Sequence, residues 1–231
     1  MATIKLWDLV GAEDDRAFSP YCWRTKMALA HKGLAFEAIP WRFTEKERLA
    51  FSGQALVPVL QDGERVVSDS WAIAQHLDER YPAKPLFGGG EAKALAFFVK
   101  NWTERVVHLA LLKVVIVDLH GNLAEKDKPY FRESREKRFG KTLEQVAGNQ
   151  SEQIAALRVS LDPMRPALAS QAFVCGDAPA YADYILFGAF QWARVMSPAR
   201  LLEKDDPLHA WRERMLDLHG GLARSAKGYP A

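Results

Sequence analysis

Ser19-Pro20-Tyr21-Cys22 has the spacing of the Cys-x-x-Cys pair of dithiol redox proteins, with serine in place of the first cysteine. In such a pair the first cysteine reacts as a thiolate of lowered pKa. A serine hydroxyl forms no disulfide and stays protonated at neutral pH. It can donate a hydrogen bond to the thiolate of another molecule, which is the chemistry that this stretch indicates.

The residues around this stretch predict a strand, a loop and a helix. Ile4–Leu9 is a short apolar strand candidate, and Pro20–Lys32 is a predicted helix that ends at Gly33. Ser before Pro is typical of the cap and first position of a helix for structural reasons alone. The N-terminus of a helix also presents free N–H groups and a positive dipole end to an anion such as a thiolate.

The energies support this hypothesis. The pKa of a thiol, about 8.5, must fall by about 2 units for the thiol to be ionised at neutral pH, which corresponds to about 2.7 kcal/mol. A hydrogen bond to a charged acceptor contributes about 1.5–3 kcal/mol, and a helix terminus adds about 0.3–1 kcal/mol. Ser19 and the helix end together are therefore sufficient.

The first eighty residues predict a small α/β domain of order β-α-β-α-β-β-α, with its last two strands antiparallel. Its other expected elements are a strand at Phe36–Trp41, a short helix at Thr44–Phe51, a hairpin of 57–60 and 66–67 around Asp62-Gly63, and a helix from Asp69 that Pro82 stops. We expect domains at 1–82 and 92–231, joined by a linker at 83–91 that is rich in proline and glycine.

The second domain is predicted to be all-helical. Its expected helices are Ala92–Leu119, Asp127–Leu143, Glu152–Leu168, Tyr181–Val195 and Pro207–Leu218. Ala94–Leu119 is apolar enough to form the buried spine of the domain. Core packing is the preferred interpretation for most of its large apolar side chains, which are Phe97, Phe98, Trp102, Val106 and Leu109.

Composition narrows the function classes. The chain has 231 residues, 48% of them hydrophobic, and a net charge of +2, so no basic stripe for nucleic acid or membranes is present. Two cysteines far apart in the sequence argue against disulfides and fit a reducing cytoplasm. The first residues resemble no signal peptide and no apolar run could span a bilayer. No histidine pair has metal-ligand spacing and no phosphate-binding loop is present, so neither a metal nor a nucleotide is expected.

Three motifs in order resemble the glutathione transferase superfamily. They are the eleven residues from Ser19 to Leu29, Val57-Pro58, and the seven residues from Ser68 to Ala74. The resemblance implies a thioredoxin-like N-terminal domain and an all-α C-terminal domain, glutathione as co-substrate, and a homodimer. The stretches 69–82, 134–136 and 176–184 are similar to bacterial β-etherases and fungal serine-type transferases. The Cys22-Trp23-Arg24 neighbourhood also resembles the zeta class, which includes maleylacetoacetate isomerases, although the usual Ser-Ser-Cys start is absent.

The resemblance assigns roles to particular residues. Ser19 would hold the glutathione sulfur, and Val57, before a cis Pro58, would pair with the cysteinyl part. Ser70 would bind the γ-glutamyl carboxylate and Asp69 its ammonium, with Gln54 and Arg42 as weaker candidates for the other groups. Each of these residues also has an ordinary structural interpretation as a cap or a loop side chain.

The electrophile would lie between the domains. Tyr21, Trp102, Arg105 and Leu109 are its candidate walls, and ordinary packing is an equal alternative for the last three. Asp183 is the acidic member of a helix capping box in which Ala180 replaces the usual Ser or Thr. We therefore interpret Asp183 as structural.

Four functions fit these residues. The leading one is a transferase in which the glutathione thiolate attacks an aromatic electrophile, with β-etherase-like cleavage of an aryl ether as one form. The alternatives are a zeta-like isomerase that regenerates glutathione and a non-catalytic protein that binds glutathione and aromatic ligands. Thiol–disulfide exchange through Cys22 is the least favoured, because Ser19 occupies the leading position.

Overall fold

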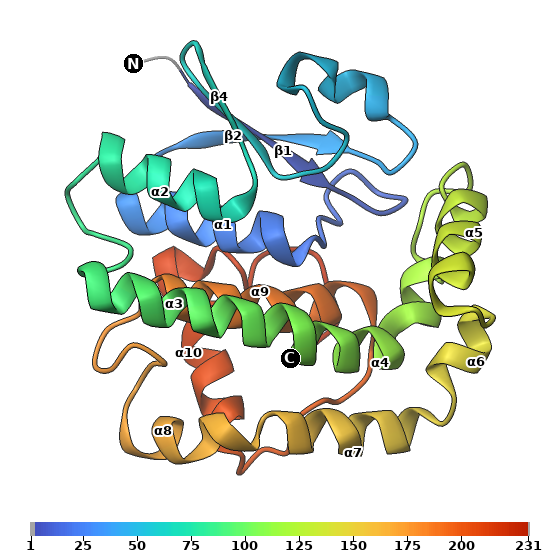
Figure 1. Ribbon diagram of the computed structural model, residues 1–231. Helices are drawn as coiled ribbons and strands as arrows, with labels where there is room; N and C mark the ends of the chain where they lie inside the picture. The colour runs from blue at the N-terminus through green and yellow to red at the C-terminus, as the bar shows by residue number, and fades with distance from the viewer. Residues whose placement is uncertain (1–2, 231) are drawn as a thin grey trace.

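The computed structural model describes residues 3–230, which form a sheet part and a helical part packed against each other (Figure 1). Met1 and Ala2 of the predicted domain 1–82, and Ala231 of the predicted domain 92–231, lie outside the described residues. Met1 and Ala2 are also the first residues of the stretch that was compared with signal peptides. The architecture is the predicted one, a thioredoxin-like domain followed by a helical domain.

The sheet has four strands in the order β2-β1-β3-β4. β1 (Ile4–Leu9) pairs parallel with β2 (Phe36–Trp41) and antiparallel with β3 (Val59–Asp62), which forms a hairpin with β4 (Arg65–Ser68). α1 (Pro20–Lys32) and α2 (Ser70–Arg80) lie on the sheet face that looks toward the helical part (Figure 1). The predicted strands, hairpin and α1 are confirmed. The short helix expected at Thr44–Phe51 is a 3₁₀ helix, η1 (Lys46–Ser52).

The helical part begins with one long rod, residues 90–121, in which a π-helical turn joins two α-helices. The first three elements of the helical part make up the rod. The elements of the helical part are α3 (Gly90–Trp102), the π turn η2 (Thr103–Val107), α4 (His108–Gly121), α5 (Lys128–Phe139), α6 (Leu143–Ala147), α7 (Gln150–Ser160), the 3₁₀ helix η3 (Asp162–Met164), α8 (Arg165–Ser170), α9 (Tyr181–Met196) and α10 (Pro207–Gly221).

Two predicted helices are divided. The one expected to reach Leu143 ends at Phe139, because Gly140 adopts a left-handed conformation with φ 65°. The one expected over Glu152–Leu168 breaks after Ser160, where Pro163 stands in the 3₁₀ turn. Proline supplies no backbone N–H, so an α-helix does not continue regularly through it.

α9 is the buried centre of the helical part. All of its residues except Arg194 are buried, and it packs against α1 of the sheet part. Gly188 makes this contact close, since a Cβ at this position would lie 2.4 Å from the Pro20 carbonyl oxygen. The N-terminus of α1 therefore rests directly on α9.

Asp183 ties the start of α9 to its surroundings. Its carboxylate accepts hydrogen bonds from the backbone N–H groups of Val174, Cys175 and Ala180 and from Trp211 Nε1. The predicted half-box is present, since Asp183 accepts from the Ala180 N–H, and the Asp183 N–H donates to the Ala180 carbonyl oxygen at 3.0 Å in place of the missing hydroxyl. Burial raises the pKa of this carboxyl despite these donors, and its contacts are those of a structural residue.

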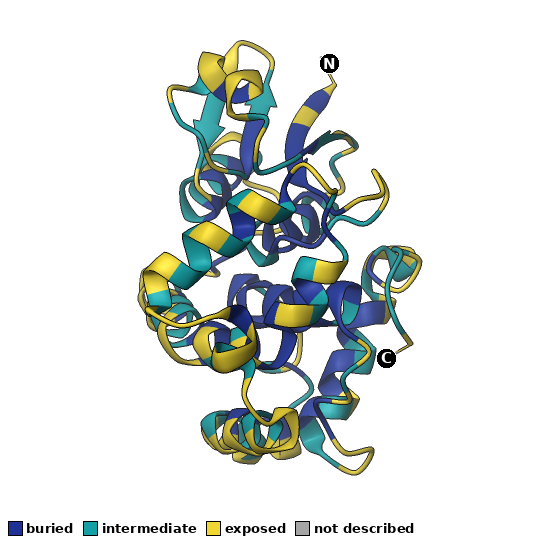
Figure 2. Ribbon diagram, turned by 90° about the vertical axis from the view of Figure 1, so that its right-hand side faces the viewer, coloured by how far each residue is buried: buried dark blue, intermediate teal, exposed yellow. Residues whose placement is uncertain are grey.

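The prediction that the large apolar residues of the long rod belong to the core is wrong for most of them. Phe97, Phe98, Val106 and Leu109 are 40% to 70% exposed, and Trp102 is half-buried. The buried face of the rod consists of smaller residues, among them Ala96, Val107, Leu111, Val114 and Val115. An apolar stripe predicts that a helix face is covered, but it does not say by what. The rest of the chain covers this face only in part, since the Phe97 ring lies 5.2 Å from that of Trp71 whereas Phe98 is 70% exposed. Figure 2 shows buried positions concentrated where the elements meet and exposed ones on the outer helix faces.

No helix within residues 3–230 combines the length and the apolar character needed to cross a membrane.

Replacing Gly188 with Ala should destabilise the fold by about 1–3 kcal/mol, because the new methyl group overlaps the Pro20 carbonyl in a tightly packed contact. Gly121→Ala is the matched control, since it also adds a helical methyl group but meets nothing within 4 Å. Urea unfolding followed by circular dichroism measures both. Equal stability of the two variants would contradict the importance of this contact.

Candidate active site

Ser19 lies at the end of the loop between β1 and α1 and is buried. Its Oγ accepts a hydrogen bond from the Cys22 backbone N–H at 3.3 Å, which makes it the cap of α1, with Pro20 in the first turn. The O–H of Ser19 remains as a donor. The predicted cap is therefore present, and it leaves a proton available for a ligand.

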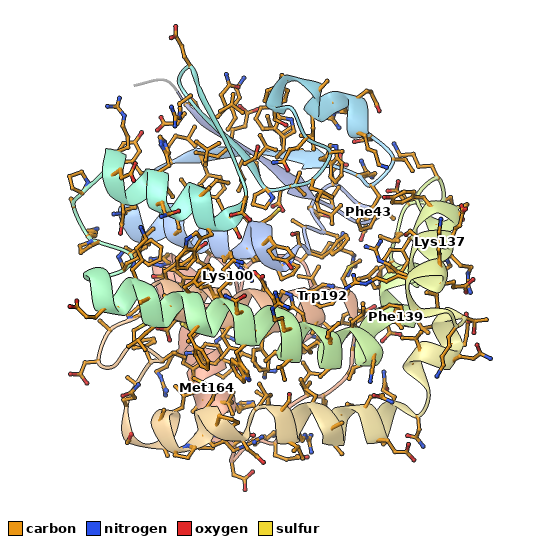
Figure 3. All side chains as sticks on the ribbon, in the orientation of Figure 1. Phe43, Lys100, Lys137, Phe139, Met164 and Trp192 are labelled. Carbon is orange, nitrogen blue, oxygen red and sulfur yellow. The ribbon has the colours of Figure 1, made fainter. Side chains whose placement is uncertain are left out.

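Ser19 faces a cavity of about 300 Å³ between the sheet part and the helical part. Figure 3 shows two of its residues, Phe43 beside α5 and Trp192 from α9. The lining is largely aromatic and aliphatic. It consists of Leu9, Phe18, Ser19, Pro20, Tyr21, Trp41, Phe43, Ala55, Leu56 and Val57 from the sheet part, and of Glu104, His108, Leu109, Leu112, Leu119, Tyr130, Phe131, Arg135, Arg138 and Trp192 from the helical part.

Cys22, in contrast to Ser19, does not line the cavity. Its side chain is fully buried, and its Sγ lies 3.8 Å from the Trp7 carbonyl oxygen. Burial, with the neighbouring Asp8 carboxylate, raises the pKa of the Cys22 thiol. A protonated and inaccessible thiol is a poor nucleophile, so this corner offers a ligand the Ser19 hydroxyl and not the Cys22 thiol.

Val57 reaches the cavity from the other side. The Val57-Pro58 peptide bond is cis, as the family resemblance implies. Val57 precedes strand β3, and its backbone N–H and C=O make no hydrogen bond within residues 3–230. They are free to pair with an extended, peptide-like ligand.

The two weaker candidates lie elsewhere. Gln54 is half-buried near Val57 but does not line the cavity. The Arg42 guanidinium donates to the carbonyl oxygens of Gly11 and Ala12 and to the Asp14 carboxylate. Arg42 is thus occupied in holding a loop.

Asp69 and Ser70 form the N-terminus of α2. The Asp69 carboxylate accepts from the N–H groups of Trp71 and Ala72 at 2.9 and 3.1 Å, and Asp69 has a left-handed φ of 76°. Ser70 is buried, and its Oγ has no hydrogen-bond partner among the described residues. A buried hydroxyl without a partner at a helix N-terminus fits an anionic group of a ligand.

A buried charge network, which we did not predict, links the two parts behind the cavity. Arg24 of α1 is fully buried, and its Nη1 lies 2.8 Å from Glu104 Oε1 of η2. Lys100 Nζ also contacts Glu104, at 3.0 Å, and the Arg24 guanidinium stacks 4.7 Å from the Tyr21 ring. The only signal in the sequence is a charged residue inside the apolar stretch of a predicted helix, which does not identify its partner eighty residues away.

The predicted walls are partly brought together. Tyr21 and Leu109 line the cavity, whereas Trp102 and Arg105 do not, and Arg105 is exposed. Glu104, His108 and Leu112 take that face of the rod instead. The π turn at Thr103–Val107 adds one residue to a helical turn and so rotates the residues around it. An ordinary helical repeat cannot anticipate this rotation.

His108 is a buried neutral histidine at the cavity wall. Its ring lies edge-on to Tyr21 and Trp192, with centroids 5.5 and 5.8 Å apart, and its Nε2 has no partner among the described residues. Burial, with the nearby Arg24 charge, lowers the pKa of His108 to about 3. The ring therefore carries no charge at neutral pH.

Residues 3–230 contain no group of three or more His, Cys, Asp or Glu side chains placed to hold a metal ion.

The chain matches two family models, described as the glutathione S-transferase N-terminal domain over residues 15–85 and the glutathione S-transferase C-terminal domain over residues 94–218. Glutathione S-transferase omega-1 of Mus musculus is 26% identical over 203 residues, which cover 86% of this chain and 73% of the relative.

Two fungal crystal structures are similar over nearly the whole chain. A glutathione transferase of Phanerochaete chrysosporium is 26% identical with a TM-score of 0.78, covering 96% of this chain and 93% of the other. A glutathione S-transferase of Ceriporiopsis subvermispora in complex with glutathione is 24% identical with a TM-score of 0.82, covering 94% and 96%.

His108 should make the fold acid-sensitive. In the unfolded chain a histidine gains a proton below pH 6.5, whereas folded His108 stays neutral until about pH 3, so the free energy of unfolding falls as the pH decreases through this window. At pH 5 the loss from this residue is about 2 kcal/mol relative to pH 7.5.

Urea unfolding at pH 7.5 and pH 5 tests this prediction. His108→Gln should reduce the difference between the two pH values by about 2 kcal/mol, whereas His209→Gln, at a half-buried position on α10, should leave it unchanged. Part of the difference remains in His108→Gln, because burial also lowers the pKa of His219, to about 4, and that of His31. An unchanged pH dependence in His108→Gln would contradict the prediction.

Proposed function

The chain belongs to the glutathione S-transferase family, and on this premise we propose that it is a serine-dependent transferase acting on aromatic electrophiles. The observation that carries the proposal is Ser19, a buried hydroxyl at the N-terminus of α1 with its proton free to point into the cavity between the two parts. Glutathione supplies the thiol. The protein lowers the pKa of that thiol and holds it.

The residues around Ser19 support glutathione as the ligand. The free backbone groups of Val57 suit the cysteinyl part of a tripeptide, and the unpartnered Ser70 hydroxyl at the start of α2 suits the γ-glutamyl carboxylate. Asp69, beside it, provides a carboxylate for the ammonium group. The sulfur then lies at Ser19, where one charged hydrogen bond and the α1 dipole favour the thiolate.

The thiolate attacks an electrophilic carbon held about 3–3.5 Å away. A C–S bond forms, and the leaving group departs with the electron pair of the broken bond. Phe43, Tyr130 and Trp192 give the cavity aromatic walls, which favours a substrate with an aromatic ring. An aryl ether with an aryloxide leaving group, as in β-etherases, is one substrate of this kind.

Consumption of glutathione separates the alternatives. A zeta-like isomerase would regenerate glutathione in every cycle, and a binding protein would hold it without forming the thiolate. The burial of Cys22 argues against thiol–disulfide exchange through that residue. We further propose a reducing, cytoplasmic setting, because Cys22 and Cys175 are both free thiols.

We also propose that the protein is a homodimer. Leu95, Phe98, Val106 and Leu109 form an exposed apolar stripe along α3, η2 and the start of α4. Phe51 and Leu56 of the sheet part are exposed as well, at 50% and 70%. Apolar surface of this extent on one protein is typical of an interface, and a second copy would cover it.

Ser19→Ala should lower kcat/KM for glutathione conjugation by about 10- to 100-fold, because the charged hydrogen bond to the sulfur contributes about 1.5–3 kcal/mol. The alkaline pH needed for half-maximal kcat/KM should rise by about one to two units. Conjugation of chlorodinitrobenzene, followed spectrophotometrically from pH 6 to 9, measures both effects.

Ser19→Ala also removes a helix cap, so the control must separate stability from activity. Thr142→Ala removes the cap of α6, outside the cavity lining, and should cost similar stability without changing the pH profile. Ser19→Thr should retain most activity. Full turnover and an unshifted profile in Ser19→Ala would refute the role of Ser19.

Phe98→Glu should convert the dimer to a monomer, because it places a charge at one of the two most exposed side chains of the apolar stripe. Val159→Glu, an equally exposed apolar position on α7 outside the stripe, is the control and should leave the dimer intact. Sedimentation velocity at micromolar concentration measures the state. A monomeric wild-type protein would refute the dimer.

A further inference from the structure

The cavity has a cationic end that the proposed sulfur chemistry does not use. Arg135 and Arg138 of α5 line the same cavity as Ser19, from the helical part. A third arginine of this helix, Arg132, is outside the lining and is paired with Glu136 and Glu144. The two arginines at the cavity differ from it in having no such partner.

Arg135 is held by aromatic rings and by no carboxylate. Its guanidinium carbon lies 4.7 Å from the Phe131 ring centre and 5.5 Å from that of Phe43, and its Nη1 donates to Ser134 Oγ at 3.0 Å. Within residues 3–230 no Asp or Glu comes within ion-pairing distance of it. Burial, together with the charge of Arg138, lowers the pKa of Arg135. A guanidinium in this setting gains from an anion that reaches it.

Arg138 is exposed at the mouth of the cavity and also has no carboxylate partner among the described residues. Burial raises the pKa of the Tyr21 hydroxyl, and the Arg138 charge is one of the smaller opposing influences on it. Arg138 is thus within electrostatic reach of Tyr21, two residues after Ser19. The cationic end and the sulfur end belong to one space.

Acidic residues in the lining do not offset these charges. Glu104 is the one carboxylate among the described lining residues, and it is already paired with both Arg24 and Lys100. The cavity therefore combines aromatic walls with an excess of positive charge, which attracts an anionic ligand.

We infer that the electrophile is an aromatic compound that carries a carboxylate, bound by Arg135 and Arg138 while its ring lies among Phe43, Tyr130 and Trp192. This inference rests on the proposed transferase function and names the substrate class of its cavity. The carboxylate orients the ring so that the electrophilic carbon faces Ser19. Neutral aromatic compounds enter the same cavity but lack this contact.

Two substrates that differ only in charge test the inference, 4-chloro-3,5-dinitrobenzoate and the corresponding neutral benzamide. In each, glutathione sulfur bonds to the ring carbon and chloride leaves with the bonding electrons. After correction for the uncatalysed rates, kcat/KM for the wild-type protein should be about tenfold higher for the benzoate, the range expected for a charged hydrogen bond.

Variants of α5 locate the effect. Arg135→Met and Arg138→Met should each lower the benzoate preference at least threefold, and Arg135→Lys should retain part of it. Lys137→Met removes the same charge from an exposed position between them that does not line the cavity, and it should leave the preference unchanged (Figure 3 labels Lys137). The KM for glutathione should be the same in all four variants.

Three outcomes overturn the inference and leave the transferase function standing. They are equal turnover of the two substrates by the wild-type protein, a preference that survives Arg135→Met and Arg138→Met, and a rise in the KM for glutathione in these variants, which would mean that the arginines bind a carboxylate of glutathione itself.

An equilibrium measurement separates this inference from failure of the proposed function. With saturating glutathione, calorimetry should show tighter binding of unreactive 3,5-dinitrobenzoate than of 3,5-dinitrobenzamide, and Arg135→Met should reduce the difference at least threefold. If neither chloro compound is turned over but this difference is present, the transferase proposal fails and the anion-binding cavity stands. If the two ligands bind equally, the inference is overturned.

Discussion

The close contact between α1 and α9 determines the geometry of the whole site. Because Gly188 has no side chain, the backbone at Pro20 rests on α9, and the buried Arg24–Glu104 ion pair joins the same two parts a turn further along. α1 supplies the cap serine at one end of the cavity, and α9 supplies Trp192 at the other. The distance between the Ser19 hydroxyl and the aromatic wall is therefore a property of this interface and not of either part alone.

Features governed by neighbours in the sequence could be predicted. The strands at Ile4–Leu9 and Phe36–Trp41 have the bounds expected from their apolar pattern. α1 begins at Pro20, after its Ser19 cap, and ends before Gly33. These signals act within one or two turns of the chain, so the sequence carries them directly. Ser19 could be predicted as the cap of α1 for the same reason, since a cap depends only on the residues at the start of its own helix.

Features that depend on distant contacts could not be predicted. The π turn at Thr103–Val107 has no local signature, and it rotates Glu104 and His108 toward the cavity while Arg105 faces solvent. The exposure of Phe98 could not be predicted either. Periodicity shows that a helix face is apolar, but it does not show whether another segment of the same chain covers that face. Arg135 contacts the ring of Phe43, from the loop that follows β2, and the ring of Phe131, from α5. Only the fold brings the Phe43 ring to α5.

The Ser19 oxygen accepts the hydrogen bond that begins α1, and its proton is the one available to a ligand. One atom thus caps the helix and offers a proton to a ligand, so few side chains can replace serine at position 19 without loss of one of these two contacts. Tyrosine would reach a sulfur atom but is too long to cap its own helix, and alanine satisfies neither demand. Serine and threonine combine both properties in one oxygen on the β-carbon, which accepts the cap hydrogen bond and donates its own proton.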